Sequence, residues 1–414
     1  MNRNFDSFID AYLHYANDDF VPEKFNLWCG LSIVAASLER KVWLPWSDTF
    51  SYYPNIYVLL VAMPGIGKST ALNKAIGLLQ EMNEETKKLK LIPSQVTEAK
   101  FIEIMGHTSP FEIGTRIHQQ SSGYYWASEA SNSLRNIYGD FIACLTDFYD
   151  CPPYWEKATL KDDKITLRNV ALNLIAGSTF EYLGKLVTSD NIMGGFASRL
   201  FYVVQREKVI RDQKFQLGAK TAEQRQARGI FRNKLIEDLK QIHSLSGPFT
   251  ADAEFGAAWE AWYPKFETSR QEIESERLQS LIVRTNGNAL KLAMLFSAAE
   301  SNDMVLRARH WERAIALVED MNQEIPMIFR EAQANSSAEN QGGLNQAIFK
   351  YLSDCEGAIG LTELKRQIAL MTHSPPHKVD STINYLLANR AINTVAASGN
   401  DIMVKLAVNP NNYL

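Results

Sequence analysis

The spacing of apolar and polar positions changes several times along this chain. Near the N-terminus, apolar residues recur every three or four positions over residues 5–16 and 23–38, which predicts two amphipathic helices. Residues 42–46 and 56–62 are short apolar runs with β-branched residues, which predicts strands. Short segments typical of α/β units follow a long helix that starts at Lys68, and they end in a strand-like run near residue 204.

The second half of the chain has helical spacing from residue 221 to about 332. The segment ANSSAENQGG (334–343) is small, polar and ends in glycine, which is typical of a linker. The pattern beyond it predicts three helices and a hairpin, the elements of a winged helix. Their expected ranges are helices 344–353, 361–371 and 377–389 and strands 391–396 and 401–406, with a turn at Ser398, Gly399 and Asn400.

These patterns predict the following regions: an N-terminal helical extension (1–45), a core (46–210), a helical lid region (211–333), a linker (334–343) and a winged-helix domain (344–414).

Composition narrows the class of protein. With 46% apolar and 22% charged residues among 414, the chain has the composition of a globular protein with a sizeable core. The net charge is −4, so any contact with nucleic acid must come from local basic patches. The four cysteines form no CxxC pair, which argues against zinc or a disulfide framework. The N-terminus lacks the apolar segment of a signal peptide, and no apolar run is long enough for a bilayer. We therefore expect a cytoplasmic protein without a membrane partner.

The segment IYVLLVAMPGIGKST places an apolar strand before a glycine turn and a helix, the context that a phosphate-binding loop requires. Gly65 and Gly67 allow backbone N–H groups to face the phosphates of ATP, Lys68 supplies positive charge, and the Ser69 hydroxyl is a candidate ligand of Mg²⁺. Ala62 stands at the position where the motif has its first glycine. The alternative interpretation is that this is a glycine turn that arose by chance and binds no phosphate. The predicted ATP-binding residues of this loop are Pro64, Gly65, Ile66, Gly67, Lys68, Ser69 and Thr70.

A second apolar strand that ends in an acid is expected beside the strand before this loop. The best candidate is GYYWASE (123–129), in which Glu129 would act as the general base on the attacking water. Ser128 stands where an aspartate usually supports Mg²⁺, so it is a candidate metal residue whose support is weaker or comes from elsewhere. The alternative is a strand end with an exposed Glu129. Glu98 is a rival base, although Thr97 before it predicts a helix cap.

A third predicted strand, 170–176, runs into Gly177, Ser178 and Thr179. Ser178 or Thr179 would contact the γ-phosphate or the water there, or would simply cap a helix. Farther along, Arg199 follows a glycine-rich turn just before the last core strand. It is a candidate arginine finger for a neighbouring subunit, or an arginine held in a structural salt bridge.

In their order, the segments AMPGIGKST, TEAKFIEIM, YYWASEA, LTDFYD, LNLIAGSTFEYL and GGFASRLF resemble a family of P-loop ATPases of phages, prophages and mobile elements, related to replicative helicases and primase-helicases. The segment LIVRTNGNALKLAMLFSAAE, followed by HWERAIALVEDM, is similar to that family's C-terminal helices and to the lid of hexameric AAA+ helicases. The resemblance covers about residues 20–325. It implies a ring-forming DNA motor in a bacterial or phage-infected cell. Arg284 would correspond to the lid arginine that reads the nucleotide, or would be a solvated charge at a helix end.

Two places are candidates for holding DNA, the first by the resemblance and the second by the pattern of the winged helix. Residues 154–168 read as two short strands around a Lys-Asp-Asp-Lys turn, where related helicases carry a pore hairpin. Lys161 and Lys164 would meet phosphates in the channel, although adjacent aspartates dilute that signal and an ordinary surface hairpin is the alternative. In the winged helix, Lys378 lies with His377 and Ser381 at the start of the third helix. That helix would meet DNA or dock on a protein.

The expected fold is therefore an α/β P-loop NTPase core, AAA+-like rather than RecA-like because a helical lid and a winged helix follow it. The expected function is an ATP-dependent DNA helicase or replication ATPase, with ATP and Mg²⁺ as cofactors. Its expected partners are single-stranded or forked DNA, further copies in a hexamer, and other replication proteins. Two alternatives stay open: a regulatory ATPase such as a helicase loader, and an ATP-switched DNA-binding module.

Overall fold

The computed structural model describes residues 3–17, 20–130, 140–158, 164–186, 195–208, 221–273, 275–355, 357–372, 374–398 and 401–406. The chain divides into two compact units, Met1–Phe329 and Arg330–Leu414. The regions expected as N-terminal extension, core and lid therefore fold together in the first unit. Among the described helices, none has an apolar stretch long enough to cross a membrane.

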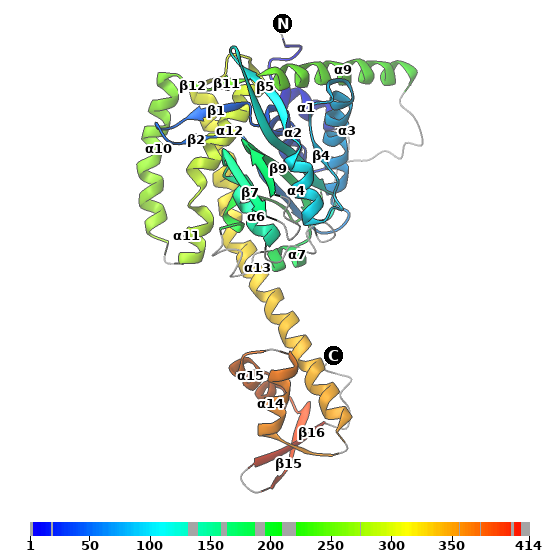
Figure 1. Ribbon diagram of the computed structural model, residues 1–414. Coiled ribbons are helices and arrows are strands. Elements are labelled where there is room, and N and C mark those ends of the chain that lie inside the picture. The colour runs from blue at the N-terminus through cyan, green and yellow to red at the C-terminus, as the bar shows by residue number, and fades with distance from the viewer. Residues whose placement is uncertain are drawn as a thin grey trace. The chain divides into compact units, whose positions relative to one another are not determined.

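A mostly parallel β-sheet forms the centre of the first unit (Figure 1). Its strands lie in the order β10 (Leu200–Gln205), β3 (Tyr57–Ala62), β9 (Val170–Ser178), β6 (Arg116–Ala127) and β4 (Leu91–Ile92). All neighbours along this path are parallel. β5 (Ser109–Ile113) pairs antiparallel with the first part of β6. The expected α/β class and the strands predicted at 56–62, 170–176 and 200–204 are confirmed.

One expectation about this sheet is wrong. The strand that leads to Glu129, β6, does not lie beside β3, because β9 lies between them and pairs with both. Every residue of β9 is buried, which suits a strand with neighbours on both sides and helices on both faces. The pairing of β9 with both β3 and β6 brings together segments that are distant in the sequence, so no local sequence pattern predicts it.

Helices cover both faces of the sheet. The side-chain amide of Asn173 in β9 donates a hydrogen bond to the carbonyl oxygen of Ala35 in α2 (Glu23–Leu38). Tyr57, which pairs with the next residue of β9, donates instead to Leu145 of α6 (Asp140–Tyr149). Because successive side chains in a strand point to opposite faces, α2 and α6 lie on opposite sides. The predicted helix at 23–38 is thus an integral layer of the core.

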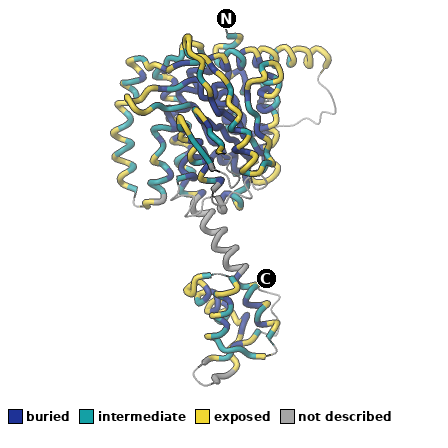
Figure 2. Tube along the Cα trace, viewed as in Figure 1, coloured by how far each residue is buried: buried dark blue, intermediate teal, exposed yellow. Residues whose placement is uncertain are grey.

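Further helices complete the unit, and the buried residues concentrate on the central strands and the helices against them (Figure 2). The helices are α1 (Phe8–Ala16), α3 (Lys68–Thr86), α4 (Glu98–Gly106), α7 (Phe180–Leu186), α9 (Ala222–Ser244), α10 (Ala253–Gln271), α11 (Glu276–Ile282), α12 (Thr285–Glu300) and the start of α13 (Ala308–Asp354). A short 3₁₀ helix, η1, spans Ala197–Arg199. Outside the central sheet lie β1 (Val42–Pro45), β2 (Ser51–Tyr52), β7 (Tyr154–Ala158), β8 (Lys164–Arg168), β11 (Gly247–Pro248), β12 (Thr250–Ala251) and β13 (Val305–Leu306).

The second unit has the predicted elements. α14 (Leu361–Thr372) and α15 (Pro376–Ala388) follow the end of α13, and β14 (Ile359–Gly360), β16 (Asp401–Leu406) and β15 (Ile392–Ser398) form a three-stranded antiparallel sheet. Residues such as Ile348, Ile368 and Ile383 form its core. The segment expected as a linker, 334–343, is instead helical within α13. Helical residues on both sides extend through it, and propagating a helix costs less than nucleating one.

The parallel strands give the sheet two distinct edges. At what we call the carboxyl edge, β3, β6, β9 and β10 all end, with Val61 opposite Ser178 and Ala127 opposite Ala176. At the amino edge the same strands begin, with Leu200 opposite Tyr57. The six residues of β3 separate the two edges by about 20 Å.

Candidate functional site

The glycine turn, residues 63–67, joins the carboxyl end of β3 to the start of α3. Gly65 and Gly67 have φ angles of +83° and +102°, which favour glycine over any residue with a Cβ. A Cβ added at Gly65 would meet nothing within 4 Å, so the space above the turn is open there. Gly67 is the N-cap of α3 and provides no side-chain cap, which leaves the first N–H groups of a 19-residue helix to other acceptors.

Lys68 begins α3 and lies under this turn. Its ammonium group donates to the carbonyl oxygens of Ala62 (2.6 Å) and Met63 (3.2 Å) at the end of β3. Burial lowers the pKa of Lys68, and the nearby Glu129 carboxylate opposes that lowering. Lys68 and Glu129 are 61 positions apart in the sequence, and they therefore interact electrostatically at the carboxyl edge.

The ends of β6 and β9 meet closely behind Lys68. A Cβ added at Gly177 would collide with the carbonyl oxygen of Ser128 and would lie 3.6 Å from Cβ of Lys68. Only glycine therefore fits at this point of β9. Gly177 lets the strand end that carries Glu129 approach Lys68 even though β9 separates their two strands.

Ser178 and Thr179, at the end of β9, are occupied by local hydrogen bonds. Ser178 is fully buried, and its hydroxyl donates to the carbonyl of Thr179 (3.1 Å). The Thr179 hydroxyl accepts from the N–H of Tyr182 (3.2 Å) at the start of α7. Thr179 therefore caps the start of α7, which is the alternative to a phosphate contact that the sequence analysis gave for this pair.

The residues of the glycine turn are of the types that could hold the phosphates of ATP with Mg²⁺. The turn combines an uncapped helix N-terminus, glycine backbone in the left-handed region and a lysine at the first helical position, features that favour a phosphate group. Pro64, Ser69, Thr70 and Ser128 are exposed around it, whereas Ile66 is buried beneath it. Among the described residues, no group of three or more His, Cys, Asp or Glu side chains could hold a metal ion. A Mg²⁺ ion would therefore depend on Ser69, on Ser128 and on the phosphates themselves.

The rival base, Glu98, belongs to a different set of contacts. It is the first residue of α4, whose N-cap is Thr97, as predicted. Its carboxylate forms an ion pair with Lys157 of β7 and lies 4.0 Å from the Cys144 sulfur. Glu98 thus ties α4 to the β7–β8 hairpin.

Arg199 and Arg284 lie together at the amino edge, across the sheet from the glycine turn. Arg199 forms an ion pair with Asp150 and donates to the Gly195 carbonyl (2.7 Å), and only 9% of its side chain is exposed. This is the structural salt bridge that the sequence left open. Arg284 lies 3.3 Å from the Ser198 hydroxyl and 3.5 Å from Asp150, with 33% of its side chain exposed. Neither arginine reaches the glycine turn of its own chain.

The structure adds a cavity that the sequence analysis missed. It lies at the amino edge, has a volume of about 470 Å³, and is lined by residues from four regions: Phe50–Asn55, Tyr149–Cys151, α10 and the start of α12. Lys291 is buried in its wall, donates to the Asn55 carbonyl (3.1 Å) and side-chain oxygen (2.7 Å), and lies 3.7 Å from the centre of the Tyr149 ring. A lysine within the apolar stretch NALKLAMLF was the available sequence signal.

The predicted DNA-contacting residues belong to the β7–β8 hairpin and to α15 of the second unit. β7 and β8 pair antiparallel as predicted, and Lys164 forms an ion pair with Glu156 across the hairpin (2.5 Å). Lys161 lies outside the described residues. In the second unit, Lys378 is exposed in the first turn of α15, and Ser381 donates to its carbonyl (2.9 Å).

Comparison with known proteins assigns no family to this arrangement. No family model matches the sequence, and no curated protein matches it. Function must therefore be inferred from the residues themselves.

Proposed function

We propose that this chain is an ATPase that hydrolyses ATP at the carboxyl edge of its sheet and works on DNA. The observation that carries the proposal is the convergence of the open glycine turn, Lys68 and Glu129 at the ends of β3 and β6. Each group has a role in phosphate chemistry, and they come from segments far apart in the sequence.

In the proposed reaction, the N–H groups of the glycine turn and the Lys68 ammonium hold the phosphates. Glu129 accepts a proton from a water molecule as the water oxygen forms a bond to the γ-phosphorus. The bond between that phosphorus and the bridging oxygen breaks, which yields ADP and inorganic phosphate. Mg²⁺, when bound, would neutralise charge on the β- and γ-phosphates. Lys68 must exchange its present carbonyl partners for phosphate oxygens, which its flexible stem permits.

The two arginines at the amino edge lead us to include a ring of subunits in the proposal. Arg199 and Arg284 lie about 20 Å from the glycine turn of their own chain, so a catalytic role for either requires the nucleotide of a neighbouring subunit. Arg284 is the better placed because more of its side chain is exposed, while Arg199 anchors Asp150. The AAA+-like class of the core, the hexameric state and the winged-helix assignment of the second unit belong to this same proposal.

The resemblance to helicase-related ATPases favours DNA as the substrate of the motor. An ATP-hydrolysis assay with and without single-stranded DNA tests this. We expect DNA to raise turnover several-fold. Stimulation only by a partner protein would instead indicate a loader, and tight ATP binding with negligible turnover would indicate a switch.

A further inference from the structure

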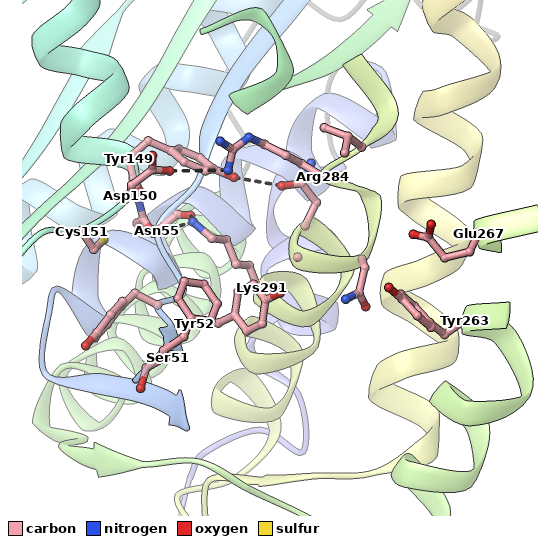
Figure 3. A pocket seen from close by; sticks show the side chains of 16 residues that line it. Ser51, Tyr52, Asn55, Tyr149, Asp150, Cys151, Tyr263, Glu267, Arg284 and Lys291 are labelled. Atoms are coloured by element: carbon pink, nitrogen blue, oxygen red, sulfur yellow. Dashed lines mark hydrogen bonds and ion pairs between the residues drawn. The ribbon is translucent and has the colours of Figure 1, made fainter. Parts of the chain in front are cut away.

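Apart from Arg284, the residues that line the cavity at the amino edge have no role in the proposed ATPase reaction (Figure 3). In this view Lys291 and Tyr52 lie between Tyr149 and Asp150 on one side and Tyr263 and Glu267 on the other. Its volume of about 470 Å³ is within the range of small-molecule sites. It lies at the opposite edge of the sheet from the glycine turn.

Aromatic rings form much of the cavity wall. Tyr52 and Phe50 contact each other edge to face, and Tyr263 is held by stacking on Trp259 at 4.7 Å. The rings that line the cavity are those of Phe50, Tyr52, Tyr53, Tyr149 and Tyr263. Such walls bind planar aromatic groups by stacking, and the stacking depends little on the identity of the group.

Positive charge lies deep in the same cavity, on Lys291 and at the start of α12. Lys291 is 6% exposed, and its ammonium is fixed by Asn55 and the Tyr149 ring. The first turn of α12, which has no side-chain cap, also lines the wall and adds a partial positive charge. Burial lowers the pKa of Lys291 to about 7, so an anion beside it would favour its charged form.

Two carboxylates also line the cavity, and both have cationic partners. Asp150 binds Arg199 and lies near Arg284, while Glu267 pairs with Arg270 at 2.6 Å. Their charges are therefore largely offset. Lys291 then gives the interior a net preference for an anion.

We propose that this cavity binds one nucleotide unit, with the base between the aromatic rings and the phosphate near Lys291. The unit is either a free mononucleotide or one residue of a single-stranded DNA. The proposal does not depend on ATP hydrolysis at the glycine turn, and its test is made in protein that carries Lys68→Ala.

The test measures binding of fluorescently labelled AMP to the full-length Lys68→Ala protein. Adding Lys291→Met should weaken binding by at least about tenfold, the size expected when a hydrogen bond to a charged group is removed. Tyr263→Ala should also weaken it several-fold. Phe266→Ala is the matched control, because Phe266 is a half-buried ring on the same helix that does not line the cavity. Thermal unfolding checks that each variant is folded, and Tyr263→Ala keeps the test decisive if Lys291→Met does not fold.

An unlabelled oligothymidine then identifies the source of the unit. Displacement of AMP by the oligonucleotide, absent in the Tyr263→Ala protein, assigns the site to DNA, whereas no displacement assigns it to a free nucleotide. The proposal is overturned if the Lys68→Ala protein binds no AMP. Equal AMP affinity in the Tyr263→Ala and Phe266→Ala proteins would overturn it as well.

Discussion

At the scale of single residues, Glu129 is the general base of the proposed reaction. Glu129→Gln should bind ATP normally and hydrolyse it at least about a hundredfold more slowly, the order expected when a positioned base is removed. Glu98→Gln is the matched control, because it removes the charge of the rival acid, which is paired with Lys157. Turnover and ATP binding are measured for both. A slow Glu98→Gln beside a normal Glu129→Gln would transfer the role to Glu98.

Lys291 gives a prediction about pH. Its pKa of about 7 in the folded chain lies below its ordinary value of 10.5, so the unfolded chain binds more protons between those values. The free energy of unfolding therefore gains a positive slope with pH above 7 from this group. In Lys291→Met, the rise in unfolding free energy from pH 7 to pH 9 should be smaller than in the wild type.

Urea titrations at the two pH values measure this difference. Lys240→Met serves as the control because Glu237 and Glu85 raise the pKa of Lys240, so its titration lies outside the window. An unchanged slope in Lys291→Met would mean that the buried ammonium titrates normally.

Single residues also show where sequence reasoning succeeded and failed. The strand, turn and helix around Gly65, Gly67 and Lys68 follow from local pattern and are present. The placement of Arg284 beside Arg199, at the far edge from Lys68, depends on how α12 packs, and its own sequence does not encode that packing. The buried position of Lys291 is likewise a tertiary outcome, since its neighbours predict only an apolar helix.

At the scale of elements, the β7–β8 hairpin is the proposed contact with DNA. Lys164→Gln should weaken binding of single-stranded DNA and lower the log–log salt slope by about 0.7 for each phosphate that the hairpin no longer neutralises. Its partner across the hairpin supplies the control. Glu156→Gln breaks the same ion pair but removes a negative charge, so it should leave DNA binding equal or stronger. Equal weakening by both changes would show that the ion pair only holds the hairpin together.

The elements themselves were largely predictable, but their pairing was not. Helical and strand spacing predicted the helices before β1, the strands β3, β6, β9 and β10 of the central sheet, and the three helices and hairpin of the second unit, but not the short strands β4, β5 and β14. The position of β9 between β3 and β6 was missed because hydrophobic spacing defines a strand without defining its neighbours. Residues 334–343 were expected to be a linker from their composition, and the helix through them reflects flanking segments that composition does not describe.

At the scale of the whole molecule, a ring would make each active site depend on two chains. Arg284→Ala protein should then bind ATP but hydrolyse it slowly, because the arginine acts on a neighbour's transition state. A Lys68→Ala subunit keeps Arg284 and can complete the intact glycine turn of an adjacent Arg284→Ala subunit. Mixing the two slow proteins should restore turnover. Full turnover by a protein that stays monomeric in size-exclusion chromatography would refute this arrangement.

The measurement that tests the central claim most directly is ATP turnover by Lys68→Ala protein. Lys74→Ala is its matched control, since Lys74 lies on the same helix and donates to Ala16, away from the glycine turn. We predict that Lys68→Ala abolishes turnover while thermal unfolding shows a folded protein, and that Lys74→Ala keeps wild-type turnover. Wild-type turnover in a folded Lys68→Ala protein would contradict the assignment of the glycine turn as the site of ATP hydrolysis.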